Sequence, residues 1–268
     1  MDTLSCAQCS LHEAAATSAI AMCSYLALFL LSRPLTRWLF PATAASLART
    51  PGQLGYWDSS FVSALNGFVN VALCVVAVVH EPALLTSTDG FFKTPETCRV
   101  SVLFLSWCSF ELMLQLLHWN LEAWKTGKVE IIVHHVSAIV AWALYLEGGY
   151  AHQLSLVGVF CEATNPFMNF RWMLSKLGLK NSRLYFVNGL LFCFSWLLVR
   201  IAFALPAASW LLIAQWHSYV GVLPVWRLAL LVGFVGVGTT LNLMWGWKIL
   251  HGATQVLSGS GTAADKHD

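Results

Sequence analysis

The sequence predicts an all-α, multi-pass membrane protein, and three observations lead to this fold class. First, 57% of the 268 residues are hydrophobic and only 10% are charged. Second, the mean hydropathy of +0.65 is far above that of an ordinary soluble domain. Third, the apolar residues occur in runs of about 20 residues, the length that a helix needs to cross a bilayer.

Seven apolar stretches are long enough to cross a membrane as helices. They lie near residues 14–32, 59–80, 98–119, 130–147, 151–172, 184–214 and 225–250. The sixth stretch is ambiguous, because Pro206 can either kink one long span or separate two short ones. With seven spans and a non-cytoplasmic N-terminus, eleven of the 15 Lys and Arg residues face the cytoplasm, three face the opposite side, and Arg200 lies within a span. The positive-inside rule therefore favours seven spans and a cytoplasmic C-terminus.

The chain divides into an anchor, a membrane domain and a tail. Residues 1–54 are expected to hold an uncleaved anchor helix and a loop, because the segment before the first span has no Lys or Arg, whereas a signal peptide opens with basic residues. Residues 55–252 form the membrane domain, and the polar residues 253–268 are expected to be a disordered tail. The net charge of +2, with scattered basic residues, argues against a nucleic-acid surface.

Polar side chains recur at helical spacing in the apolar spans. The third and fifth spans give the clearest stripes, with Glu111, Gln115, His118 and Glu122 in one and Glu162, Asn165 and Asn169 in the other. A charged side chain at the bilayer centre costs about 3 kcal/mol on insertion scales, so these faces should avoid lipid. The simplest arrangement is a ring of helices around a polar cavity. In this ring, Arg200 and Glu162 are expected to form an ion pair.

The fourth span contains the adjacent residues His134 and His135, at about 6–8 Å from its cytoplasmic end. Consecutive helical residues project about 100° apart, so both imidazoles cannot easily bind one metal ion, and no metal site is predicted. One imidazole is expected to face the cavity as a general base or an acyl-accepting nucleophile, and the other to contact a neighbouring helix. A membrane di-iron hydroxylase would need His-x-x-His-His boxes, which the nine histidines do not supply.

Helix packing is the alternative role for each of these residues taken alone, because polar side chains often join membrane helices at about 0.6 kcal/mol each. Their joint occurrence on consecutive spans favours a functional cavity. The candidate catalytic residues are His134, His135 and Glu162. The candidate residues of a substrate cavity are Glu111, Gln115, His118, Asn165, Asn169, Arg171 and Asn188.

Two segments of the chain resemble the TLC domain family, which groups ceramide synthases, translocation-associated membrane proteins and ceroid-lipofuscinosis-type proteins. They are Lys128-Val-Glu-Ile-Ile-Val-His134-His135-Val-Ser-Ala-Ile and Glu162-Ala-Thr-Asn-Pro-Phe-Met-Asn169-Phe-Arg171-Trp172. The resemblance covers roughly residues 55–252. It implies a six-helix barrel around an acyl-chain cavity, in a lipid protein of the endoplasmic reticulum.

In ceramide synthases the equivalent His pair is catalytic, and the resemblance transfers this role to His134 and His135. Those enzymes have a downstream His-Asp and a further Asp where this chain has Thr164-Asn165 and Met168. The chain therefore looks closer to the branch that does not contain ceramide synthases. Only Glu162 or Glu111 could supply the acidic group.

Two functions remain open on the sequence. One is a lipid acyltransferase, or a regulator of phospholipid composition, that takes acyl-CoA as co-substrate and has no bound cofactor. The other is a non-catalytic membrane protein that senses lipid or escorts cargo, with loop residues such as Lys125 and Lys128 recognising the partner. The expected partners are membrane lipids or fatty acyl chains, and a dimer or a cargo protein is left open.

Overall fold

The computed structural model describes residues 11–121, 124 and 128–258, and every regular element in these ranges is a helix. The long helices are α1 (Leu11–Leu39), α3 (Gln53–His80), α4 (Pro95–Leu117), α5 (Lys128–Gly148) and α11 (Val225–Leu257). The short ones are α2 (Pro41–Ala48), η2 (Pro82–Leu85), α6 (His152–Phe160), η4 (Cys161–Thr164), α7 (Asn165–Lys176), α8 (Arg183–Ser195), η5 (Trp196–Ala204), α9 (Leu205–Ala214) and α10 (Trp216–Tyr219). The predicted all-α fold class is confirmed.

Six helical stretches of the described chain are long and apolar enough to cross a membrane. The sixth predicted span, which Pro206 could have divided, is one continuous helical run, Arg183–Ala214. In this run α8 leads through the π-helical η5 into α9. Pro206 lies in the first turn of α9, where the missing N–H has no intrahelical partner to lose.

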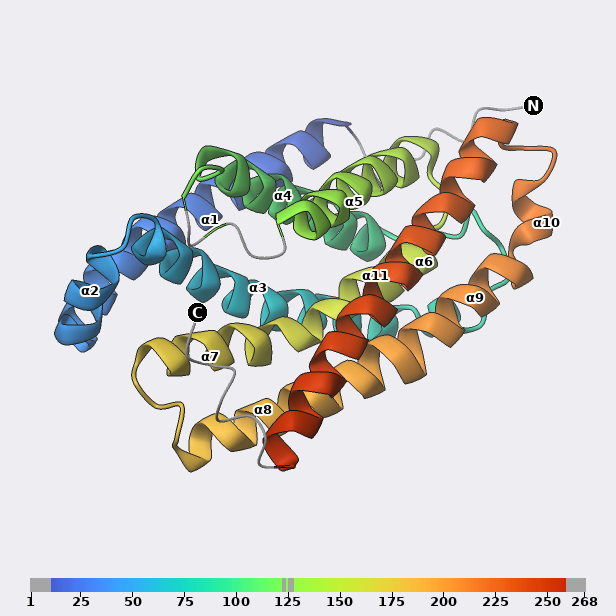
Figure 1. Ribbon diagram of the computed structural model, residues 1–268. Coiled ribbons are helices and arrows are strands. Elements are labelled where there is room, and N and C mark those ends of the chain that lie inside the picture. Colours follow the sequence, from blue (N-terminus) through green and yellow to red (C-terminus); the bar gives the residue numbers. More distant parts are fainter. Residues whose placement is uncertain (1–10, 122–123, 125–127, 259–268) are drawn as a thin grey trace.

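The predicted fifth span, 151–172, is broken into three consecutive pieces, α6, the 3-10 helix η4, and α7. Pro166 accounts for the break, because its ring lacks an N–H and disfavours a regular helix through the preceding turn. Taken together the three pieces run across the molecule beside the long helices (Figure 1). The described chain therefore has six candidate membrane spans, not the seven predicted, because the segment 151–172 is broken into short helices. The protein is a multi-pass membrane protein.

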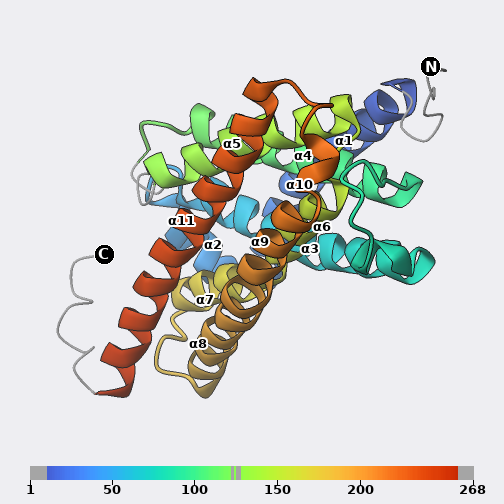
Figure 2. The same cartoon turned by 90° about the vertical axis from the view of Figure 1, so that its right-hand side faces the viewer.

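The helices pack as a closed ring (Figures 1 and 2). In order around the ring, α3 contacts α4, α4 contacts α5, α5 contacts α11, α11 contacts α8 and η5, α8 contacts α7, and α7 returns to α3. Helix α1 lies outside this ring, against α3 and α4, and α6 packs against both α4 and α9. This arrangement matches the expected six-helix barrel with an added anchor helix.

Two predicted boundaries differ from the structure. The loop expected before residue 55 contains α2, whose first residue, Pro41, suits the start of a helix. Helix α11 continues to Leu257, past residue 253, where a disordered tail was expected, and residues 259–268 lie outside the described chain. Of the residues named from sequence, Glu122, Lys125 and the side chain of Lys128 also lie outside it.

Two groups of buried apolar side chains form the core. One joins α1, α3 and α4, where Tyr25 packs edge-on against Trp107 and also donates a hydrogen bond to Asn66. The other joins the end of α5 to α6, α9 and α11, around Tyr145 and Tyr150. The second group lies directly beside the candidate site.

Candidate functional site

A cavity of about 140 Å³ lies between α5, α6, η5, α9 and α11. One end, called here the polar end, is lined by His134, Glu162, Arg200, Asn242 and Trp245. The opposite end, called the far end, is lined by Tyr145, Leu154, Ala208 and Phe234. A cavity with polar groups at one end and a largely apolar lining suits an amphiphile with a hydrocarbon chain.

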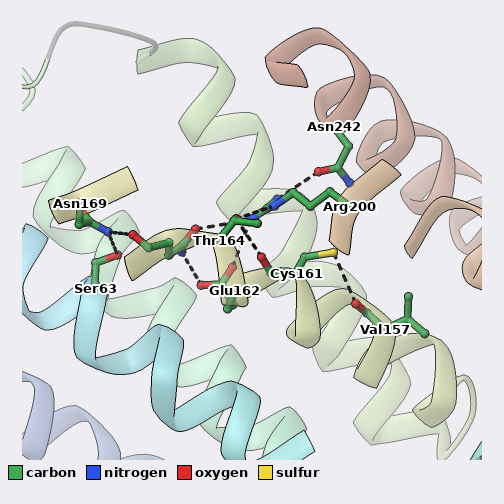
Figure 3. Close-up of polar contacts among 9 residues, drawn as sticks. Ser63, Val157, Cys161, Glu162, Thr164, Asn169, Arg200 and Asn242 are labelled. Atoms are coloured by element: carbon green, nitrogen blue, oxygen red, sulfur yellow. Dashed lines mark hydrogen bonds and ion pairs between the residues drawn. The ribbon is translucent and has the colours of Figure 1, made fainter. Parts of the chain in front are cut away.

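Arg200 is the centre of the polar end (Figure 3). Its Nε donates to Thr164 Oγ1 at 2.9 Å, one terminal nitrogen donates to Asn242 Oδ1 at 3.0 Å, and the other donates to Asn165 Oδ1 at 3.4 Å. Its guanidinium also lies 4.4 Å from the centre of the Trp196 ring. Three helical segments therefore hold this one buried cation.

Glu162 provides the negative charge beside it. Its Oε1 lies 4.0 Å from Arg200, and only 5–6% of either side chain is exposed. Its Oε2 accepts a hydrogen bond of 2.7 Å from Asn165 Nδ2. The predicted Arg200–Glu162 ion pair is confirmed. Because both charges are buried, each needs the other and the surrounding donors to remain ionised at low cost.

The two adjacent histidines have different surroundings. His134 lines the cavity, and its ring centre lies 5.6 Å from that of Trp245 and 5.2 Å from that of His135. His135 is buried at 9% exposure outside the cavity lining, and its Nδ1 has no hydrogen-bond partner among the described residues. The expected difference of about 100° between consecutive residues explains why only one imidazole reaches the cavity.

This arrangement has the groups that proton transfer beside an acyl chain requires. An imidazole can accept and return a proton near neutral pH. Arg200 and Asn242 offer N–H donors near a position where charge could develop on a carbonyl oxygen. The same residues could equally hold the polar head of a lipid that does not react.

The predicted polar stripe of α4 lies elsewhere in the described structure, outside the cavity lining. Glu111 Oε1 accepts a 2.8 Å hydrogen bond from Ser59 of α3, and Gln115 Nε2 donates to the carbonyl oxygen of Trp124 at 2.8 Å. His118 stacks on the Trp124 ring, with centres 4.7 Å apart. These three side chains join α3, α4 and the segment after α4.

The predicted residues after Glu162 fall into two groups, one at the polar end and one that joins helices elsewhere. Asn165 bonds both Glu162 and Arg200 and so belongs to the polar end. The other three join helices: Asn169 donates to Ser63 at 3.0 Å, Asn188 donates to the carbonyl oxygen of Phe167 at 2.8 Å, and Arg171 lies 4.3 Å from the centre of the Tyr185 ring.

Sequence reasoning missed Asn242 and Trp245 on α11. Asn242 is an amide in an apolar span, the same signal that singled out Asn165, but its polar neighbour at helical spacing is Thr239, not a charged or amide residue. Trp245 gives no sequence signal, because tryptophans are frequent in this chain. Its Nε1 donates to Glu130 Oε2 at 2.9 Å, and Lys248 donates to the other oxygen at 2.7 Å, which joins α5 to α11 at the polar end.

A second hollow is a groove of about 360 Å³ on the other side of α6 and α9. Its lining includes Val75, Leu85, Phe160, Phe203 and Trp210. The lining residues are apolar except for Gln153 and Cys74, and none of them is a His, Asp, Glu, Lys or Arg. The groove has no group for acid–base chemistry, so the cavity with His134 is the better candidate site.

Comparison with known proteins gives a family match over most of the chain. The family model described as TLC domain matches residues 56–251. TLC domain-containing protein 4 of Homo sapiens is 26% identical over 209 residues, which cover 75% of each chain. TLC domain-containing protein 4-B of Danio rerio is 24% identical over 227 residues, covering 80% of this chain and 81% of the relative. TLC domain-containing protein 4 A of Dictyostelium discoideum is 23% identical over 209 residues, covering 77% and 78%. No solved structure matches the chain.

Proposed function

Because the chain belongs to the TLC domain family, we propose that this integral membrane protein binds a fatty acyl chain in its cavity and transfers it from acyl-CoA to a lipid acceptor. His134 is the general base of this reaction. The single observation behind the proposal is that His134 lines a cavity in which polar groups lie beside a largely apolar wall. Lipid metabolism in the endoplasmic reticulum follows from this proposal and from the family resemblance.

The reaction needs one proton acceptor and one group that stabilises negative charge. His134 takes the proton from the hydroxyl or amine of the acceptor lipid as that group attacks the thioester carbonyl carbon. The new C–O or C–N bond forms, the C–S bond breaks, and the CoA thiolate takes the proton back from His134. Arg200 and Asn242 face the carbonyl oxygen while it is negatively charged.

A comparison of the hydrogen-bond partners of Glu162 and His134 supports His134 as the reactive residue. Glu162 is bonded by Asn165 and paired with Arg200, so it positions the cation and does not take the proton. The ring of His134, in contrast, has no hydrogen bond to another described residue. It is therefore the group that is free to meet an acceptor.

A second candidate is a lipid-binding protein without chemistry, which senses lipid or escorts cargo. The observation that favours it is that Arg200 already donates hydrogen bonds to Thr164, Asn242 and Asn165. Fewer of its N–H groups are therefore left for a reacting carbonyl oxygen. Under this candidate, replacing His134 would leave function unchanged.

Lipid mass spectrometry distinguishes the two candidates. The purified protein is incubated with acyl-CoA and membrane lipids, and products are measured for the wild type, His134→Ala, and His134→Ala with His135→Ala. His251→Ala is a matched control, because His251 is exposed and lies outside the cavity lining. We expect the acylated product to disappear in both His134 variants and to persist in the control. An unchanged product profile in the double variant would disprove acyl transfer at this site.

The same proposal includes an orientation. The distribution of Lys and Arg supports a non-cytoplasmic N-terminus and a cytoplasmic C-terminus, so the polar end of the cavity faces the cytoplasmic side, from which acyl-CoA arrives. An epitope at the C-terminus should be digested by protease added to sealed microsomes. Protection of that epitope would reverse the orientation.

A further inference from the structure

We propose that the cavity admits one saturated acyl chain of about a dozen carbons, and that Tyr145 at the far end sets this length. The inference rests on the proposed acyl-chain function and adds the class of chain that the site prefers. It follows from the depth and the volume of the cavity and from the packed side chains behind its far end.

The depth follows from the helices that line it. His134 and Tyr145 both line the cavity from α5, and Trp245 and Phe234 do so from α11. Each pair spans eleven helical steps, or about 16 Å at a rise of about 1.5 Å per residue. Carbon–carbon bonds of about 1.5 Å advance an extended chain by about 1.25 Å each, so about 13 carbons fit between the two levels.

The width allows a single chain. A volume of about 140 Å³ holds about ten waters at 10–15 Å³ per water centre, or about 300 Å³ of liquid. Small residues form the middle of the wall, namely Ala138, Ala141, Gly158, Ala204 and Gly238. A diacyl lipid would need about twice this volume for two chains of the same length, so the occupant has one chain in the cavity.

Tightly packed aromatic residues lie behind Tyr145 at the far end. The ring of Tyr145 lies 5.4 Å from that of Tyr150, and Tyr150 lies 6.2 Å from Tyr219. Both Tyr150 and Tyr219 are 1% exposed, and Leu231 beside them is fully buried. An acyl chain that reaches Tyr145 therefore cannot extend further without displacing core side chains. Close packing makes such displacement unfavourable.

This geometry predicts how affinity depends on chain length. Each methylene that moves from water into the cavity strengthens binding by about fourfold. The gain should stop when the terminal methyl group reaches Tyr145. Chains longer than this should bind no more tightly than the optimum, because their additional methylenes find no room.

The test measures binding, so it does not depend on turnover. Saturated fatty acids from octanoate to stearate compete with radiolabelled dodecanoate for the full-length protein in detergent. For the wild type we expect the affinity to peak between dodecanoate and tetradecanoate. Tyr145→Ala should move the peak to palmitate or beyond. Tyr145→Phe keeps the ring and should leave the peak in place.

A second variant covers a failure of Tyr145→Ala to fold. Gly238 lines the cavity, and a Cβ atom at this position would meet no heavy atom within 4 Å, so a side chain can begin there and Gly238→Leu adds bulk to the cavity wall. It should move the peak to chains shorter than dodecanoate.

The outcomes separate this inference from the proposed function. Affinity that rises steadily through stearate, or a peak that neither Tyr145→Ala nor Gly238→Leu moves, overturns the role of Tyr145. Acyl transfer would survive that result. If no fatty acid displaces dodecanoate from the wild type, acyl-chain binding itself is wrong, and both proposals fail.

Discussion

Replacing Arg200 with methionine removes the buried cation and leaves the carboxylate of Glu162 without its counter-charge. The two groups lie 4.0 Å apart, and their side chains are 6% and 5% exposed. At this distance and an effective dielectric constant of 20, their attraction is about 4 kcal/mol. Breaking one side of a buried pair typically costs about 3–5 kcal/mol, in agreement with this value. The thermal midpoint of Arg200→Met should therefore fall by about 10 °C.

A double-mutant cycle identifies the part of this loss that belongs to the pair. Glu162→Gln alone should also destabilise the protein, because it leaves the guanidinium unpaired. Combined with Arg200→Met, it should recover most of the loss, since two neutral side chains need no counter-charge. We expect a coupling free energy of about 3 kcal/mol from thermal unfolding in detergent micelles.

The pair formed by Arg227 and Glu147 is the matched control. It also joins two spans, but 66% of the Glu147 side chain is exposed. The same cycle at this pair should give less than about 1 kcal/mol, because solvent screens the charges. If the losses from Arg200→Met and Glu162→Gln simply add, or if both cycles give the same coupling, the buried pair does not stabilise the polar end as argued.

Three further substitutions test the packing around the site. Gly67→Ala should lower the free energy of unfolding by about 1–3 kcal/mol. The added Cβ would lie 2.8 Å from both the carbonyl oxygen of Glu162 and Cδ of Pro166, which is too close. A thermal midpoint equal to that of the wild type would contradict this. Ser59→Ala removes the 2.8 Å donor to Glu111 and should cost about 1–3 kcal/mol in chemical denaturation; no change would mean that the carboxyl group finds another partner. Trp245→Phe removes the hydrogen bond to Glu130 and should accelerate amide hydrogen exchange in the first turns of α5; unchanged exchange there would show that Lys248 alone suffices.

Six of the seven predicted spans, and the polar faces, were predictable because both signals are local. An apolar run of sufficient length and a helical spacing of polar residues can be read without knowledge of neighbouring helices. Glu162 and Asn165, three residues apart, were expected on one face, and they do meet at the polar end. His134 was expected to differ from His135, and the structure places only His134 on the cavity wall.

The partner of each polar face was not predictable, because it depends on packing. Helix α4 contacts α1, α3, α5 and α6, so its polar stripe meets other helices instead of the cavity. Glu111 reaches Ser59, and His118 reaches Trp124. In the same way, a lone amide such as Asn242 gains its role only because α11 passes beside Arg200.

Two irregular segments meet at the polar end, and their contact explains how the site is held. Arg200 lies in the middle of the π-helical η5, and Thr164 is the last residue of η4, which packs against η5. Within a membrane, backbone groups that leave the regular helical pattern need other partners. The Thr164 hydroxyl donates to the carbonyl oxygen of Cys161 at 3.1 Å, and the Cys161 thiol donates to that of Val157 at 3.5 Å. Because these side chains satisfy the interrupted backbone, the break forms from the sequence itself. It holds Glu162 at the cavity wall before any lipid chain enters.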